Sequence, residues 1–189
     1  MTQARRPPLY ARVLGDRWHA LPEPLRRMHD FNDEGRAEGL AEIDRGDGVI
    51  AQLVAAIVGF PRAGQNVPVQ VMFKANAKGE LWQRTFAGKR FSSYQFADGE
   101  PRGAVVFERF GLITIALHLV LQNERLDVIP VSWSLLGIPL PKSLMPVGET
   151  YEWVDSQNRF NFHVEIGHPW FGRVVRYRGF LVPVCFAPE

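Results

Sequence analysis

Hydrophobic and polar residues alternate along most of the chain after residue 66, and this period of two is typical of β-strands. The alternation, interrupted by turn-forming residues, predicts strands over residues 67–73, 81–86, 90–96, 105–110, 112–121, 126–135, 150–154, 160–166 and 174–182. No segment with a helical period separates these strands, so we expect an antiparallel sheet. About nine strands at this spacing predict a barrel, a half-barrel or a strongly curved sheet. The pattern does not decide whether the sheet closes.

Residues 1–66 have a different pattern and are predicted to be mostly helical. Hydrophobic residues recur at helical spacing over residues 9–14, 21–29 and 49–58. Asp47 is a credible N-cap for the third helix, and Gly59 ends it. Residues 34–45 alternate like a strand, although their glycines weaken that prediction. We therefore expect a single α+β domain over residues 1–189, with two or three N-terminal helices packed on an antiparallel sheet formed by residues 67–183.

The predicted strand 112–121 is apolar on both faces. One face carries only isoleucine and leucine, and the opposite face has just two polar members, Thr114 and His118. An exposed apolar face of this size would promote aggregation, so we expect both faces to be hidden from water. A sheet curved around an apolar hollow and covered outside by a helix would hide both. Alternation relates the faces only to each other, so it does not show which residues point inward.

The composition of the 189-residue chain narrows the classes of function. Its 22 basic and 20 acidic residues leave a net charge of +2, which is too balanced to indicate a nucleic-acid partner. Its one cysteine cannot form an internal disulfide. The first eight residues lack the apolar stretch of a secretory signal, and the longest apolar segment, residues 49–60, is far shorter than the ~20 residues that cross a bilayer. We expect a cytoplasmic protein without a transmembrane segment.

Aromatic residues make up 12% of the chain, and several flank arginines on predicted strand faces. Trp82, Arg84 and Phe86 share one face, where the guanidinium could stack on the rings and bind the acidic head of a lipid-like ligand. The same arrangement is typical of a structural salt bridge, and both interpretations stay open. Arg176 has the same two interpretations. As the lining of the hollow we predict Trp82, Arg84, Phe86, Tyr94, His118, Trp133, Trp153 and Arg176.

We find no catalytic signature in the sequence. None of the serines lies in a nucleophile elbow, and no glycine-rich segment has the spacing of a phosphate-binding loop. His163 and Glu165 share a strand face and could ligate a metal with another histidine, but this spacing is common on solvated strands, so we predict no metal site and no cofactor. His29 and Asp30 are interpreted as helix-end residues rather than an acid–base pair. An enzyme is the third hypothesis, and it requires a cavity in which His118 or His163 meets a carboxylate.

Short segments spread over nearly the whole chain carry a family resemblance. They are LYARVLG at 9–15, HALP at 19–22, LRRMHD at 25–30, GFP at 59–61, WQRTFAG at 82–88, RFS at 90–92, ERFG at 108–111, LLGIPLP at 135–141 and VRYRGF at 175–180. Together they resemble a bacterial family known as domain of unknown function 4166. Members similar to this chain occur alone or after a nucleotide-binding domain resembling saccharopine dehydrogenase or short-chain reductases, which implies an accessory or substrate-holding role beside redox chemistry. The family has no accepted activity, so the resemblance assigns no catalytic residue.

Two functions without catalysis fit this pattern. The first hypothesis is that the hollow of the sheet binds a hydrophobic, lipid-like small molecule with an acidic head. The alternative is an interaction domain that docks on a separate nucleotide-binding redox protein through residues 137–146. On that surface we expect Ile138, Leu140, Leu144 and Met145 to be exposed. Arg84→Ala separates the two hypotheses, because it should abolish ligand retention and leave partner binding intact.

Overall fold

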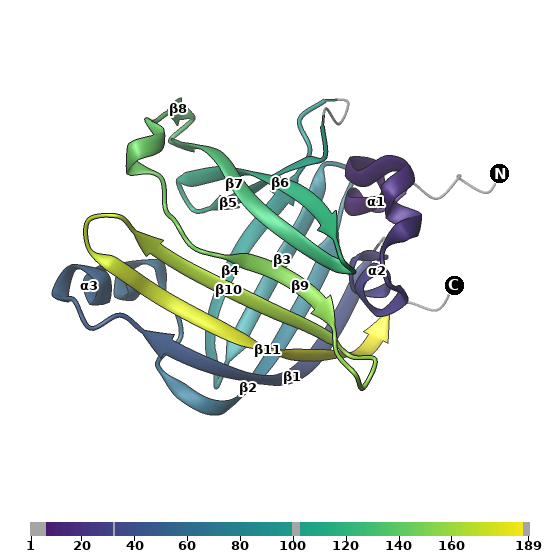
Figure 1. Cartoon of the computed structure of the whole chain (residues 1–189), viewed down its shortest axis with the longest axis horizontal. Helices are drawn as coiled ribbons and strands as arrows, with labels where there is room; N and C mark the ends of the chain where they lie inside the picture. The colour runs from purple at the N-terminus through teal and green to yellow at the C-terminus, as the bar shows by residue number, and fades with distance from the viewer. Residues whose placement is uncertain (1–6, 32, 100–102, 187–189) are drawn as a thin grey trace.

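The strands of the computed structural model close into an antiparallel barrel (Figure 1). The structure describes residues 7–31, 33–99 and 103–186, with side chains as far as Val184. Within these ranges, ten strands form a ring in the order β6-β5-β4-β3-β2-β1-β11-β10-β9-β7, and β6 also pairs with β7. The prediction of a curved antiparallel sheet is confirmed, and the sheet closes.

The bounds of the strands follow the predicted segments closely. They are β1 (Glu34–Arg45), β2 (Gly64–Ala75), β3 (Gly79–Phe86), β4 (Lys89–Phe96), β5 (Val105–Phe110), β6 (Ile113–Gln122), β7 (Arg125–Leu135), β8 (Ile138–Pro139), β9 (Thr150–Val154), β10 (Phe160–His168) and β11 (Gly172–Phe186). The two-residue β8 pairs with β7 and lies outside the ring. β1 lies within the ring between β2 and β11, although it precedes residue 67, where we expect the sheet to begin.

Glycines allow β1 and β11 to approach closely. A Cβ atom at Gly39 would collide with the carbonyl oxygen of Phe180, and one at Gly179 would collide with that of Leu40. Glycine in a strand interior often marks such a close backbone approach or a bend at a barrel corner. Gly39, one of the glycines that weaken the strand prediction for β1, is therefore required by the pairing with β11.

Three short N-terminal helices cover one end of the barrel, on the right in Figure 1. They are α1 (Leu9–Leu14), the 3₁₀ helix η1 (Gly15–Ala20) and α2 (Glu23–His29). Their apolar side chains are almost completely buried, including Leu9 and Tyr10 of α1 and Leu25 and Met28 of α2. Because this end is filled by side chains, it forms a closed floor under the barrel interior.

A longer helix, α3 (Val49–Val58), lies at the opposite end, on the left in Figure 1. It connects β1 to β2 and packs on β11. Gly59 ends it in a left-handed conformation with a φ of 84°, as predicted. The predicted cap is wrong: the N-cap is Gly48, without a side-chain hydrogen bond, and the Asp47 backbone carbonyl accepts from Gln52 Nε2 instead.

Strand β6 only partly meets the expectation that both of its faces are hidden. Leu117 and Leu119 on the inner face are buried. On the other face Ala116 is buried and His118 is half-buried. The prediction is wrong at Leu112, which lies in the β5–β6 turn, outside the strand, and is largely exposed.

Candidate functional site

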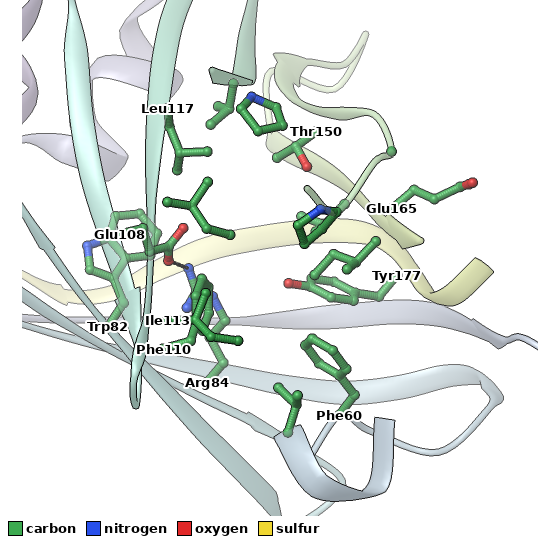
Figure 2. Close-up of a pocket in the computed structure, with 18 of the residues that line it drawn as sticks. Phe60, Trp82, Arg84, Glu108, Phe110, Ile113, Leu117, Thr150, Glu165 and Tyr177 are labelled. Atoms are coloured by element: carbon green, nitrogen blue, oxygen red, sulfur yellow. Dashed lines mark hydrogen bonds and ion pairs between the residues drawn. The ribbon is translucent and has the colours of Figure 1, made fainter. Parts of the chain in front are cut away.

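An apolar cavity occupies the interior of the barrel (Figure 2). Its volume is about 220 Å³. A single water needs only ~10–15 Å³ by this measure, so the cavity has room for far more than a few waters. Most of its wall is contributed by Val54, Val58, Phe60, Phe110, Ile113, Ile115, Leu117, Val128, Pro130, Pro146, Val147, Val164 and Ile166.

The alternation of the strands sets which side chains face this cavity. On β3, Trp82 and Arg84 point inward. On β4 the buried residues are Phe91, Ser93 and Gln95. In register, Trp82 lies opposite Ser93 and Arg84 lies opposite Phe91, so these side chains form neighbouring cross-strand pairs. The pairing of these strands therefore brings a group of polar side chains together in the wall of an otherwise apolar cavity.

That polar group contains Arg84, Ser93 and Glu108. Arg84 Nη1 donates to Ser93 Oγ at 2.8 Å, and Ser93 Oγ donates to Glu108 Oε1 at 2.5 Å. Arg84 Nη2 lies 3.4 Å from the same carboxylate oxygen. The guanidinium carbon lies 5.1 Å from the Trp82 ring centre, a distance at which a cation is attracted to the ring. The positive charge of Arg84 is thus balanced inside the protein.

Gln95 and Tyr177 add hydrogen-bonding capacity to the same wall. Gln95 Oε1 is buried and has no hydrogen-bond partner among the described residues. The Tyr177 hydroxyl points into the cavity in Figure 2. Burial raises the pKa of Tyr177 to about 12, so the phenol stays protonated and can donate a hydrogen bond at neutral pH. The wall therefore offers an unpaired acceptor and a neutral donor to an occupant.

At the end of the cavity nearest the N-terminal helices, buried polar pairs attach these helices to the barrel. His29 Nε2 lies 2.7 Å from Glu152 Oε2, and the Tyr10 ring stacks on the His29 ring with 3.8 Å between centres. Glu80 accepts hydrogen bonds from the Leu9 backbone N–H and the Trp82 indole, at 3.1 and 3.2 Å. Burial is the largest influence on Glu80 and raises its pKa. These pairs hold α1 and α2 in place.

The structure places only two of the eight predicted lining residues, Trp82 and Arg84, in the cavity wall. Phe86 is buried beside Phe91 and Tyr177, and it lines a second hollow at the surface. Trp133 lies near the end of β7, where its indole donates to the Pro141 carbonyl at 3.0 Å.

The remaining four predicted residues lie on the outward faces of their strands. Tyr94 donates to Asn76 Oδ1, and Arg176 forms an ion pair with Asp44. Trp153 packs against Tyr151, whose ring centre is 5.3 Å away. His118 alternates with the inward-facing Leu117 and Leu119. Alternation could not assign these residues, because it does not say which face is inside.

The acid–base arrangement required by the enzyme hypothesis is not formed by either predicted histidine. His163, like His118, lies outside the cavity wall, and its ring stacks on Tyr151 with 4.8 Å between centres. Burial lowers the pKa of His163. The histidine that meets a carboxylate is His29, which the sequence places at a helix end. Its partner Glu152 is 123 residues away in the chain, and no local signal could have identified it.

Glu108 and Gln95 are the site residues that the sequence analysis missed. Each belongs to a predicted strand, and each alternates with residues of the opposite face. If Arg84 is known to point inward, the register of β3, β4 and β5 places Gln95 and Glu108 on the same inner face. Without that register, the sequence does not identify them. Within the described part of the chain, no group of three or more His, Cys, Asp or Glu side chains could hold a metal ion. No helix there is long and apolar enough to span a membrane.

Comparison with known proteins gives one match. The family model described as "Domain of unknown function (DUF4166)" matches residues 21–181, which extend from just before α2 to a point within β11. Neither the curated proteins nor the solved structures include a significant match.

Proposed function

Since this chain belongs to the DUF4166 family, whose function is unknown, we propose on physical grounds that its barrel binds a hydrophobic, lipid-like small molecule in the interior cavity. The observation that carries the proposal is the size and apolar character of that space. Protein interiors are normally packed as densely as organic crystals, with few voids larger than a water. A cavity of about 220 Å³ is therefore far larger than the voids of a packed core, and its mostly apolar wall with a few polar groups has the character of a small-molecule site.

The polar wall suits an uncharged end group better than an acidic one. Arg84 already has a carboxylate partner in Glu108, so an acidic ligand would have to displace that carboxylate or share the arginine with it. Gln95 Oε1 needs a donor, whereas the Tyr177 hydroxyl and Arg84 can donate. A hydroxyl or amide end group can both donate and accept. We infer that a long-chain alcohol or amide binds more tightly than the fatty acid of the same length.

Fluorescence titration with N-phenyl-1-naphthylamine, an uncharged apolar dye, tests the binding function. The full chain should bind the dye, and a long-chain alcohol should displace it at lower concentration than the matched acid. Native mass spectrometry of the protein purified without detergent should also show a retained small molecule.

A matched pair of variants shows whether the dye enters the cavity. Val128 lines the cavity, whereas its neighbour Ile129 on the same strand points outward and is exposed. Val128→Trp should weaken dye binding at least about tenfold, because the indole fills the space, while Ile129→Trp should leave it unchanged. Equal effects of the two variants, or no binding of dye or lipid by the folded protein, would refute the proposal.

A further inference from the structure

The cavity opens at the α3 end of the barrel. At the opposite end the lining includes Trp82 of β3 and Tyr10 of α1, and both are buried. At the α3 end the lining includes Phe110 and Ile113, which are half-buried, and Val147, which is exposed. An apolar ligand would therefore enter and leave beside α3.

Helix α3 has its larger apolar side chains on the outside. Its ten residues include no charged side chain. Its buried residues are the small Ala51 and Ala55, while Val54 and Val58 line the cavity. The exposed face carries Val49, Ile50, Leu53 and Ile57. A helix that served only to cover the barrel would bury its largest side chains, so this outer face indicates a second apolar partner.

Exposed apolar residues also occur on the turns around the same opening. They are Leu112 in the β5–β6 turn, Leu136 and Ile138 in the β7–β8 hairpin, and Trp170 in the β10–β11 turn. Trp170 is 74% exposed. The antiparallel order of the strands brings these turns to the α3 end, and Figure 1 shows α3 and β8 there, far from α1 and α2. We call these four residues and the exposed face of α3 the mouth surface.

Three basic residues lie next to the mouth surface. Arg62 follows α3, Lys89 begins β4, and Lys142 lies in the 3₁₀ helix η2 (Lys142–Leu144). All three are exposed, and none forms an ion pair with a carboxylate of the described residues. Arg62 and Lys89 also line the second hollow, which could accommodate a phosphate-bearing headgroup. Basic groups next to exposed apolar residues favour a surface that is both anionic and apolar.

We propose that the mouth surface docks on a lipid bilayer that contains anionic lipids, and that the ligand passes directly between the bilayer and the cavity. The inference about ligand passage rests on the proposed binding function. Such a bilayer accounts for the exposed apolar residues, the exposed tryptophan and the nearby basic residues at the same time. Its acyl region accepts the aliphatic side chains, its interface favours tryptophan, and its phosphates attract lysine and arginine. A protein partner on the same surface would cover the opening through which the ligand passes.

The docking is tested by flotation of the full chain with vesicles of phosphatidylcholine and phosphatidylglycerol, compared with vesicles of phosphatidylcholine alone. We expect the chain to float with the mixed vesicles and to float much less with the neutral ones. The variant Leu53→Asp/Ile57→Asp should reduce the bound fraction at least about tenfold. The matched control Met72→Asp/Ile129→Asp changes exposed apolar residues of the barrel wall and should bind like the native chain.

Several outcomes would overturn the docking proposal. One is the absence of flotation with the mixed vesicles, and another is an equal loss in the two double variants, each shown by circular dichroism to be folded. Sedimentation equilibrium supplies a third: a native dimer that becomes monomeric in Leu53→Asp/Ile57→Asp would assign the mouth surface to a second copy of this chain.

The cavity variant separates this proposal from the binding function. Val128→Trp should lose dye binding and keep flotation, because it leaves the mouth surface intact. If the native chain binds the dye but does not float with the vesicles, the docking proposal is refuted and the binding function is not. Flotation of a native chain that binds no dye or lipid would refute the binding function and the transfer of ligand, and leave only the docking surface.

Discussion

Removal of the Arg84 guanidinium should show how far the barrel depends on its interior ion pair. Side-chain exposure of Arg84 and Glu108 is 15% and 11%, so both charges are largely withdrawn from water. Arg84→Met leaves the Glu108 carboxylate with Ser93 as its partner in an apolar cavity. Removing one member of a buried ion pair lowers the free energy of unfolding by about 3–5 kcal/mol. Because Arg84 and Glu108 are still partly exposed, we expect a smaller loss of about 2–3 kcal/mol. For a chain of this size, that loss lowers the melting temperature by about 4–12 °C.

The double variant Arg84→Met/Glu108→Met distinguishes this explanation from a general packing defect. Replacing both members of a buried pair with apolar residues of similar volume is often neutral or stabilising. The Ser93 hydroxyl then loses its partners, at a cost of about 1 kcal/mol. We expect the double variant to lie within about 1 kcal/mol of the native protein in urea unfolding, which is well below the sum of the losses of the two single variants. A double variant as unstable as the sum of the two single variants would refute the reasoning.

Three further predictions concern stability. Gly39→Val should cost at least about 3 kcal/mol in urea unfolding, because its Cβ has no room beside the facing strand. His29→Leu should cost about 2 kcal/mol, because the Glu152 carboxylate loses its 2.7 Å partner, whereas the exposed His19→Leu should change stability by less than about 0.5 kcal/mol. Burial raises the pKa of Tyr177 above its unfolded value, so native stability should fall as the pH rises from the unfolded pKa of about 10 to about 12, and Tyr177→Phe should reduce that slope in alkaline unfolding titrations.

Most of the architecture could be predicted from the sequence, because hydrophobic and polar residues alternate regularly along its long strands. Strand β2 is an example: Val69, Val71 and Phe73 are buried, and Gln70, Met72 and Lys74 are exposed. The closure of the sheet into a barrel could not be predicted from the sequence. It depends on β1 pairing with β11 and on β9 pairing with β7, and both contacts join strands that are not consecutive. The β7–β9 contact covers only two residue pairs, so no sequence pattern could have specified it.

The site was less predictable than the fold, since it requires knowledge of which faces point inward. Trp82 and Arg84 were identified because an arginine between aromatics is a local feature. Trp153 and Tyr94 are also aromatic residues of predicted strands, but they lie on outward faces. On the expected docking surface, Ile138 is exposed as predicted, whereas Leu140, Leu144 and Met145 are half-buried. That segment is attached to β7, where the Leu140 N–H donates to the Trp133 carbonyl and the Trp133 indole donates to the Pro141 carbonyl.

The pairing of β1 with β11 constrains how the protein can be made. Residues 35–45 pair with residues 175–186, so about two thirds of the chain, residues 46–171, separates the two strands. On the ribosome, β1 emerges long before its partner, and synthesis proceeds at roughly 5–20 residues per second. Its edge therefore stays available for unwanted association for several seconds, and contacts of this sequence separation also slow folding. The ring can be completed only when the last strand has left the exit tunnel.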